Sequence, residues 1–326
     1  MKYSIHALAV LAASGWLATA MAQQIDSAYP KQPIRMVVTF PPGGSTDTLV
    51  RMLVPKLNDV LGQPVVVENR PGAGGSIGLS VVAKAAPDGY TMGVAAAGAL
   101  SANSSLYAQM PYNVQKDLRP VSMLAAFPFV LVGNPALSAK TLKDVIERAK
   151  SRPGELSVAH GGNGTAMHLS VALWNEMAGI RVVPIPYKGS GPAAMDAMSG
   201  QVPLAMVDLP TSLQQIKAGK LIAYAVTGSK RLQQLPDVPT MSEGGVPGYE
   251  STGWFGVVAP SATPTHAVAR VNAALSEALN DPALQASIRN LGIETSSGSP
   301  ESFGLFISSE TSKWARVIHQ HNIKID

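Results

Sequence analysis

A unit of apolar strand, glycine-rich loop and helix recurs along this chain, and this repetition limits its fold more than any other feature. Residues 34–40 (IRMVVTF) form a continuous apolar run of strand length. The loop PPGGS follows at residues 41–45, and apolar residues then recur at helical spacing from Thr46 until Gly62 ends the helix. Alternating strands and helices predict an α/β protein whose mostly parallel sheet is covered by helices on both faces.

The units fall into two series. The first has strands at residues 34–40, 65–68 and 90–97, and the second begins with a strand at residues 127–132 and ends with a strand at residues 221–227. Many prolines and glycines without a clear period predict a long connection over residues 231–252.

The end of the chain returns to a strand and helices that have no sheet of their own. A strand is expected at residues 254–259, an amphipathic helix at 266–279 and a final helix at about 300–319. The simplest arrangement is that this strand and these helices join the first sheet. We therefore expect a discontinuous lobe 1 (residues 23–126 plus 253–326), an inserted lobe 2 (residues 127–252), and two strands that cross between the lobes. Facing lobes of this kind form a cleft that can close by hinge motion.

The first 22 residues have the pattern of a bacterial secretory signal peptide. Met1-Lys2 is a short positive region, Ile5 to Leu17 is almost wholly apolar, and Ala20-Met21-Ala22 is a cleavage site. We expect the mature chain to begin at Gln23 and to reside in the periplasm, the alternative being a buried N-terminal helix. No later stretch is long and apolar enough to cross a membrane.

Composition excludes several classes of function. The chain has no cysteine, which rules out disulfides and thiolate chemistry. The net charge of +4 becomes +3 without the signal peptide, because Lys2 is the only charged residue of that segment. The basic residues are scattered and lack the interleaved aromatics of a nucleic-acid surface, so no nucleic acid partner is expected.

Three glycine-rich loops, at residues 40–47, 69–76 and 161–165, each join a strand to a helix. Glycine lets the backbone approach a ligand, and the free N–H groups of a helix start favour an anion. Two such starts in one cleft predict a seat for a small carboxylate, although any one loop could be an ordinary turn. None of the loops ends in Gly-Lys-Ser/Thr or fits G-x-G-x-x-G with a partner acid, so we expect neither cofactor nor metal.

Five motifs together carry a family resemblance: PPGGSTD after a strand, ENRPGAGGSIG, PDGYT, PIPYKG at residues 184–189 and GQVP at residues 200–203. From about Tyr29 to the C-terminus the chain resembles the extracytoplasmic solute receptors of the tripartite tricarboxylate transporter system, the Bug family. The resemblance implies a type II periplasmic binding protein fold and a small carboxylate held largely by backbone and water. It also implies a monomer that meets the integral-membrane subunits of a transporter transiently.

The resemblance implies ligand contacts from both lobes. In the order of the chain, these residues are Phe40, Gly43, Gly44, Ser45, Asp47, Gly74, Gly75, Ser76, Ala97, Gly98, Ala99, Gly162, Gly164, Thr165, Tyr187 and Asp208.

Several residues keep more than one interpretation. Asp47 could accept a hydrogen bond from a ligand or fix a bridging water, or it could be an acid favoured by the dipole of its helix. Pro55 should kink or shorten the first helix. His160 stands where the family more usually has a small or hydroxyl residue, which could change the ligand. His168 is expected on a helix face, and Lys188 is expected in solvent.

Two other functions compete with that of a solute receptor that performs no chemistry. An exported hydrolase would use Ser45 or Ser76 as nucleophile, but G-x-S-x-G is absent and no histidine is tied to an acid in a recognisable pattern. A scaffold or adhesin would bind no small ligand at all. The sequence leaves open which carboxylate is bound and whether it is bound for uptake or for sensing.

Overall fold

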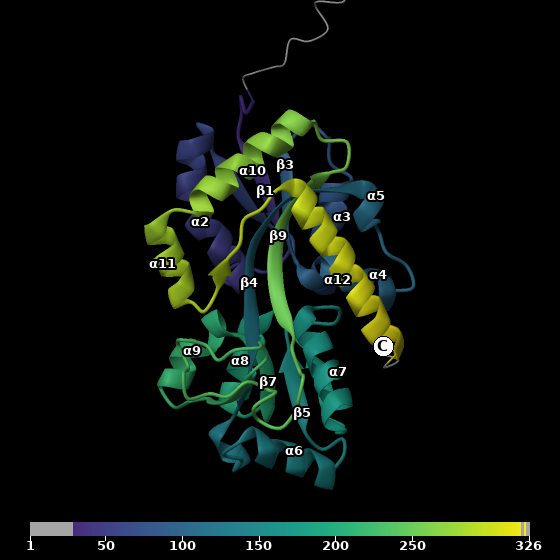
Figure 1. The fold of residues 1–326 in the computed structure, drawn as a ribbon, viewed down its shortest axis with the longest axis vertical. Helices are drawn as coiled ribbons and strands as arrows, with labels where there is room; N and C mark the ends of the chain where they lie inside the picture. The colour runs from purple at the N-terminus through teal and green to yellow at the C-terminus, as the bar shows by residue number, and fades with distance from the viewer. Residues whose placement is uncertain (1–28, 321–322, 324–326) are drawn as a thin grey trace, which may run out of the picture.

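The computed structural model describes residues 29–320 and residue 323, so the predicted signal peptide lies outside the described residues. Ten strands of the described part join in one mixed sheet, and helices pack on both of its faces (Figure 1). Along the long axis the molecule has two halves. We call residues 29–128 and 252–320 the upper half, and residues 129–251 the lower half, as they stand in Figure 1.

The upper half is built on three parallel strands, with the last strands of the chain beside them. These strands are β1 (Ile34–Val38), β2 (Val65–Asn69), β3 (Thr91–Ala96), β9 (Thr252–Pro260) and β10 (Glu294–Thr295). β1 lies between β2 and β3, and β9 lies antiparallel to β3. The core is formed by apolar strand residues such as Val37 and Val94, which are fully buried.

The long strand β4 (Leu118–Gly133) belongs to both halves. Its first part pairs with β9 from Leu118 to Pro128, and its last part pairs with two strands of the lower half from Phe129 onward. The sequence predicted only residues 127–132 of it. Every partner of β4 and β9 is antiparallel, so the expectation of a mostly parallel sheet is wrong: parallel pairing is confined to the interior of each half.

The strands of the lower half repeat the arrangement of the upper one. They are β5 (Ser157–His160), β6 (Val183–Pro186), β7 (Leu204–Asp208) and β8 (Ile222–Val226). β5 lies between β6 and β7 in parallel, while β7 and β8 both pair with β4. The expected long connection corresponds to residues 227–251, which contain no helix or named strand.

Helices connect the strands and cover the sheet. Those of the upper half are α2 (Ser45–Leu61), the turn η2 (Ala73–Gly75), α3 (Ser76–Ala83), the turn η3 (Gly98–Ala102), α4 (Asn103–Leu106), α5 (Val114–Asp117), α10 (Thr265–Leu279), α11 (Pro282–Asn290) and α12 (Pro300–Gln320). Those of the lower half are the turn η4 (Pro135–Leu137), α6 (Leu142–Ser151), α7 (Ala166–Ala178), α8 (Ser190–Ser199) and α9 (Leu209–Lys217).

Pro55 is expected from the sequence to kink or shorten its helix. The helix α2 continues past Pro55 to Leu61, so the expectation of a shortened helix is wrong. Proline removes one helical donor, but Leu49, Leu53 and Leu57 on one face are buried and keep the helix in place. The helix ends as predicted at Gly62, whose φ of 69° suits a left-handed cap and whose N–H donates to the carbonyl of Asn58 at 2.9 Å.

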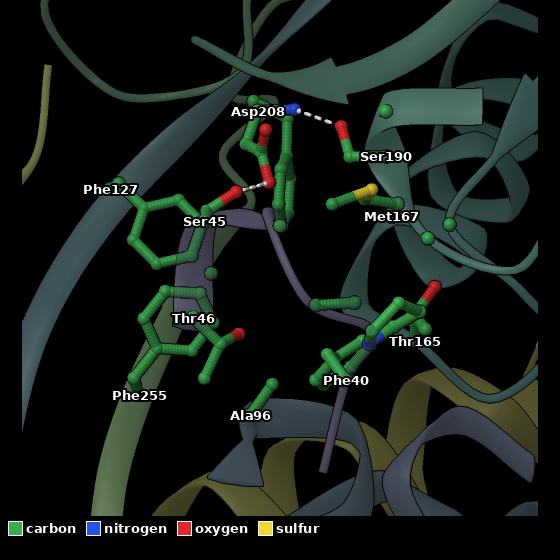
Figure 2. Close-up of a pocket in the computed structure, with 18 of the residues that line it drawn as sticks. Phe40, Ser45, Thr46, Ala96, Phe127, Thr165, Met167, Ser190, Asp208 and Phe255 are labelled. Carbon is green, nitrogen blue, oxygen red and sulfur yellow. Dashed lines mark hydrogen bonds between the residues drawn. The ribbon is translucent and has the colours of Figure 1, made fainter. Parts of the chain in front are cut away.

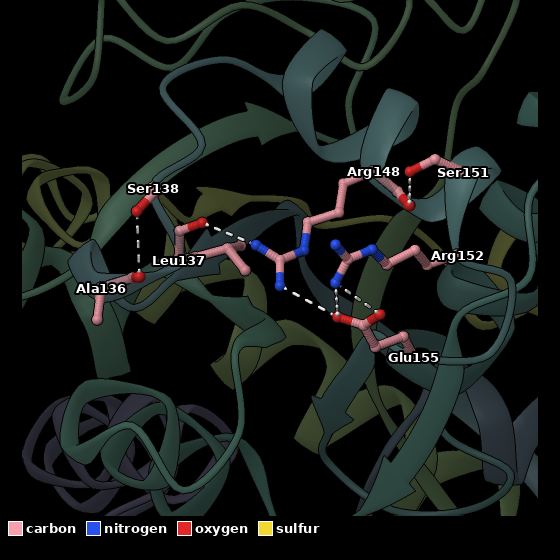
Figure 3. A network of polar contacts seen from close by, with 7 residues as sticks. All are labelled: Ala136, Leu137, Ser138, Arg148, Ser151, Arg152 and Glu155. Atoms are coloured by element: carbon pink, nitrogen blue, oxygen red, sulfur yellow. Dashed lines mark hydrogen bonds and ion pairs between the residues drawn. The ribbon is translucent and has the colours of Figure 1, made fainter.

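At the far end of the lower half, ion pairs close the C-terminal turn of α6 (Figure 3). Arg148 donates to the carbonyl of Leu137 at 3.2 Å and pairs with Glu155 at 3.2 Å, and Arg152 pairs with the same carboxylate at 3.3 Å. The guanidinium of Arg148, first among several partners, lowers the pKa of Glu155. These side chains are well exposed, so they order a turn and contribute little stability.

The C-terminal helix α12 also packs on the lower half. Trp314 and Ile318 of α12 form a buried cluster with Ala102 of η3 and Leu169 of α7. The indole of Trp314 donates to Glu310 at 3.1 Å, and that of Trp254 in β9 donates to the same carboxylate at 3.3 Å. Among the described residues, no helix combines the length and apolar character that a membrane span needs.

Candidate ligand-binding cleft

A cavity of about 220 Å³ lies between the two halves, at the carboxyl ends of β1 and β7 (Figure 2). Three helices begin at its wall: α2 at Ser45, α7 at Ala166 and α8 at Ser190. The N–H groups of a helix's first turn have no partner within the helix and carry its positive dipole end. The cavity therefore presents three anion-attracting ends, two of them from the lower half.

The loop between β1 and α2 is held by the carboxylate of Asp47. This carboxylate accepts hydrogen bonds from Gly43 N, Arg51 Nε and Asn69 Nδ2, each at 2.9 Å. Burial acts to raise the pKa of Asp47, but the hydrogen bonds from Arg51, Gly43 and Asn69 outweigh it and the pKa is lowered. Asp47 is thus an ionised anchor that fixes the loop from behind.

The upper and lower halves are joined across the cavity by Ser45 and Asp208. The hydroxyl of Ser45 donates to Asp208 Oδ2, while Thr211 Oγ1 donates to Oδ1 at 2.8 Å (Figure 2 shows the Ser45 bond). The backbone N–H of Asp208 donates to Ser190 Oγ at 3.0 Å. Burial raises the pKa of Asp208, partly offset by its hydroxyl donors.

The loop between β5 and α7 is held by neutral groups. His160 Nδ1 accepts from Gly162 N at 3.2 Å, and the hydroxyl of Thr165 donates to the carbonyl of Gly162 at 2.7 Å. Thr165 also caps α7 by accepting from His168 N at 3.3 Å. The first-turn N–H groups of Ala166 and Met167 are left at the cavity wall.

His160 and His168 form a buried stacked pair behind this loop. Their ring centroids lie 4.9 Å apart at an interplanar angle of 24°. Burial, followed by the charge of the neighbouring His168, lowers the pKa of His160 to about 3, and burial lowers the pKa of His168. Both rings are therefore neutral at physiological pH. Their free nitrogens, His160 Nε2 and His168 Nδ1, have no hydrogen-bond partner in the described structure.

Much of the remaining wall is aromatic. Phe127 and Phe129 come from β4 and Phe255 comes from β9, the two strands that link the halves, and Phe40 faces the cavity from the end of β1. The ring centroids of Phe127 and Phe255 lie 4.6 Å apart, and those of Phe127 and Phe129 lie 5.7 Å apart, edge to face. Met167 closes the side opposite Phe127 in Figure 2.

An outer cavity of about 510 Å³ adjoins the inner one and shares Phe40, Pro41, Gly161, Lys188 and Gly189 with it. Its other lining residues come from the second glycine-rich loop, from the C-terminal end of α4 and from the lower half. They are Pro71, Gly72, Ala73, Gly74, Gly75, Tyr107, Gly162, Asn163, Pro186 and Tyr187.

The structure brings most of the predicted site residues to these two cavities. The inner cavity is lined by Phe40, Gly43, Gly44, Ser45, Ala97, Thr165 and Asp208. The outer one is lined by Gly74, Gly75, Gly162 and Tyr187, and the hydroxyl of Tyr187 donates to Asp196 at 2.7 Å. Lys188 lines both and is exposed, as expected of a solvated lysine.

Asp47, Ser76, Gly98, Ala99 and Gly164 line neither cavity. Asp47 faces its own loop, and Ser76 accepts from Asn103 Nδ2 at 3.0 Å inside the upper half. A Cβ on Gly98 would overlap the carbonyl oxygen of Gly164, so these two glycines meet where the halves touch. Ala99 lies buried beside them, with its carbonyl bonded to Tyr112.

The sequence did not single out Phe127, Phe129, Phe255, Met167 or Ser190 as cavity residues. The aromatic residues stand in continuous apolar runs, where the pattern indicates core. Ser190 had a usable signal, because Gly189-Ser190 joins a predicted strand to a predicted helix as the other loops do.

Neither serine of the hydrolase hypothesis contacts a histidine. In the described residues Ser45 bonds to Asp208, and Ser76 bonds to Asn103 and Tyr112. No group of three or more His, Cys, Asp or Glu in the described part of the chain could hold a metal ion.

Residues 49–323 match the family model of the tripartite tricarboxylate transporter family receptor. The chain belongs to this family. It is 41% identical to protein BugT of Bordetella pertussis over 298 residues, which cover 91% of each chain.

Solved relatives have the same fold as this receptor. One is Rpa4515 of R. palustris with adipate, at 35% identity and a TM-score of 0.87, covering 91% of this chain and 99% of that one. Another is the periplasmic binding protein BugD, at 36% identity and a TM-score of 0.85, covering 91% and 99%. The chain thus has the periplasmic binding protein fold, with β4 and β9 linking its halves.

Proposed function

We propose that this protein captures a small organic carboxylate in the inner cavity and acts as the periplasmic receptor of a tripartite tricarboxylate-type transporter. The observation that carries the proposal is the convergence of three helix N-termini on one cavity. A carboxylate there would accept hydrogen bonds from first-turn N–H groups of α2, α7 and α8 without needing a basic side chain. The adipate bound to Rpa4515 supports this class of ligand.

The two halves would act as lobes that close over the ligand. In this proposal lobe 1 comprises residues 23–126 and 253–326, and lobe 2 comprises residues 127–252. Contacts across the cleft favour the closed form: Ser45 bonds to Asp208, and Tyr107 donates to the carbonyl of Asn163 at 3.3 Å. The closed receptor, a monomer, would then dock transiently on the membrane subunits of the transporter.

Capture without chemistry agrees with what lines the cavity. The hydroxyl of Ser45 is committed to Asp208, and no histidine lines either cavity in the described residues. A serine nucleophile needs an adjacent base to take its proton. The receptor proposal therefore needs no catalytic residue, cofactor or metal.

The test is thermal unfolding of the mature protein with a panel of organic acids and the matched neutral amides. A ligand at a hundred times its Kd should raise the free energy of unfolding by about 2.7 kcal/mol. We expect at least one acid to raise the Tm, while its amide leaves the Tm unchanged. Equal shifts with acid and amide would refute the carboxylate seat, and no shift with any acid would favour the scaffold hypothesis.

A further inference from the structure

We propose that the ligand is a monocarboxylate with an apolar body, of which benzoate and hexanoate are suitable probes. This inference rests on the proposed capture of a carboxylate and names the class of acid. The proposed ligand differs from that of the relative solved with adipate, because adipate has a carboxylate at each end.

The first argument is the apolar wall. Phe127, Phe129 and Phe255 are at most 4% exposed, so they form a fixed surface on the linking strands. Phe40 and Met167 supply apolar surface on the opposite side, as Figure 2 shows. A flat or chain-like apolar body between these walls would gain from burial, ring contacts and sulfur–aromatic contact.

The second argument is the shortage of basic groups. Lys188 is the only Lys, Arg or His among the described residues that line either cavity, and it is exposed at the rim that the two cavities share. Asp208 is the only acidic residue that the described part of the chain places in the inner wall, and its oxygens are occupied by Ser45 and Thr211. Apart from Lys188 at this rim, the described residues of the inner wall offer no cationic partner for a second carboxylate.

The third argument is that the hydroxyls of the wall are already committed. Ser45 bonds to Asp208, Thr165 to the carbonyl of Gly162, and Ser190 to Thr211 and Asp208 N. The hydroxyl of Thr46 remains, and it lies in the first turn of α2, beside the N–H groups assigned to the first carboxylate. A second carboxylate placed between the phenyl rings, away from the helix starts and from Lys188, would be buried without partners, which is strongly unfavourable.

Isothermal titration calorimetry of the mature protein with benzoate, hexanoate, adipate and malate tests the inference. We expect benzoate or hexanoate to bind at least tenfold more tightly than adipate and at least a hundredfold more tightly than malate. Tighter or equal binding of adipate or malate would overturn the inference and leave carboxylate capture intact. Failure of all acids, including a wider panel, would overturn the proposed function itself.

Two variants of one wall residue sharpen the test. Met167 is partly exposed in the first turn of α7, so its side chain can change without opening the core. Met167→Lys should weaken benzoate binding at least tenfold and strengthen adipate binding, while Met167→Leu should keep the wild-type order. Circular dichroism melting of both variants checks the fold. An unchanged benzoate-to-adipate ratio in folded Met167→Lys would show that the wall does not face the ligand, and would overturn the inference.

Discussion

Two loops face each other across the cleft: residues 40–47 of the upper half and residues 161–165 of the lower half. They have similar geometry but are stabilised by different chemical groups. Each ends a strand, turns on glycine and presents the start of a helix. The upper loop is held by an ionised carboxylate, Asp47, with three donors. The lower loop is held by a neutral imidazole, His160, and a hydroxyl, Thr165.

The difference teaches that one loop geometry can be held by a charged or by a neutral anchor, and that both anchors act in their deprotonated form. Asp47 has a lowered pKa, so its contribution to stability is present above its unfolded value of 3.8 and is lost as the pH falls through its folded value. The pKa of His160 is also lowered, so as the pH falls the unfolded chain binds a proton at this residue before the folded protein does. The free energy of unfolding therefore decreases as the pH falls from 6.5 to about 3. Acid therefore weakens both walls of the cleft, the lower one at higher pH.

The largest expected effect is a loss of ligand affinity when a residue at the contact between the two halves is changed. Gly98→Ala would place a methyl group on the carbonyl oxygen of Gly164, so the loops could no longer approach. We expect ligand affinity to fall at least 1,000-fold, about 4 kcal/mol, while each half keeps its fold. Calorimetry and circular dichroism measure the two properties. Gly304→Ala on α12 is the control, since its Cβ would make only ordinary contact; wild-type affinity in Gly98→Ala would disprove the role of this contact.

The next largest effect is expected in the pH dependence of the free energy of unfolding, through His160, the neutral anchor of the lower loop. Asn at position 160 can accept from Gly162 N but does not titrate, so His160→Asn should remove the acid sensitivity that His160 causes. Between pH 6.5 and 4 the wild type should lose about 3 kcal/mol of unfolding free energy more than the variant. Urea unfolding at a series of pH values measures this. Parallel pH profiles of the two proteins would contradict the assignment.

A smaller effect is expected at the charged anchor of the upper loop. Asp47→Asn keeps one acceptor oxygen but loses the charge that Arg51 and Gly43 N need, and should cost about 2 kcal/mol at pH 7. Denaturant unfolding measures it. Asp59→Asn, exposed on the same helix, is the matched control and should remain within about 0.5 kcal/mol of wild type. Equal stability of the two variants would mean that Asp47 does not anchor the loop.

The smallest effect distinguishes neighbouring glycines of the upper loop. Gly43 has a φ of 77°, which an alanine adopts only with strain, whereas Gly44 has a φ of −74° and room for a methyl group. Gly43→Ala should cost about 1 kcal/mol of unfolding free energy, and Gly44→Ala should cost less, because it only replaces glycine by a poorer N-cap. If the order is reversed in thermal melting, the backbone of this loop differs from the one described.

The sequence predicted the parts of the fold that local patterns determine. The helix at 266–279 is α10, and the helix predicted to end at Gly62 is α2, with Gly62 as its left-handed cap. Helix α11 was not predicted, because Ile288 is its only buried residue and its sequence therefore shows no apolar periodicity. The length of β4 escaped because Pro120 and Pro128 interrupt its pattern, although pairing with β9 carries the strand through both.

The sequence predicted the parts of the site that are formed by the backbone of glycine-rich loops. It did not predict the parts that depend on packing between the two halves. Glycine-rich helix starts marked the loops of Ser45 and Thr165. No local pattern shows that Gly98 and Gly164 meet each other instead of a ligand, or that Phe127 faces a cavity instead of the core. Such facts depend on residues far apart in the sequence and appear only when the halves are assembled.

The strand β4 joins the two halves and also carries Phe127 and Phe129 into the cavity wall. In the proposed closure, β4 would serve as a hinge as well as a wall. A ligand that presses on these rings would then strain the same strand that bends when the cleft closes. Changes in the stiffness of β4 at Pro128, which has no place in the cavity lining, would then alter how readily the cleft releases its cargo.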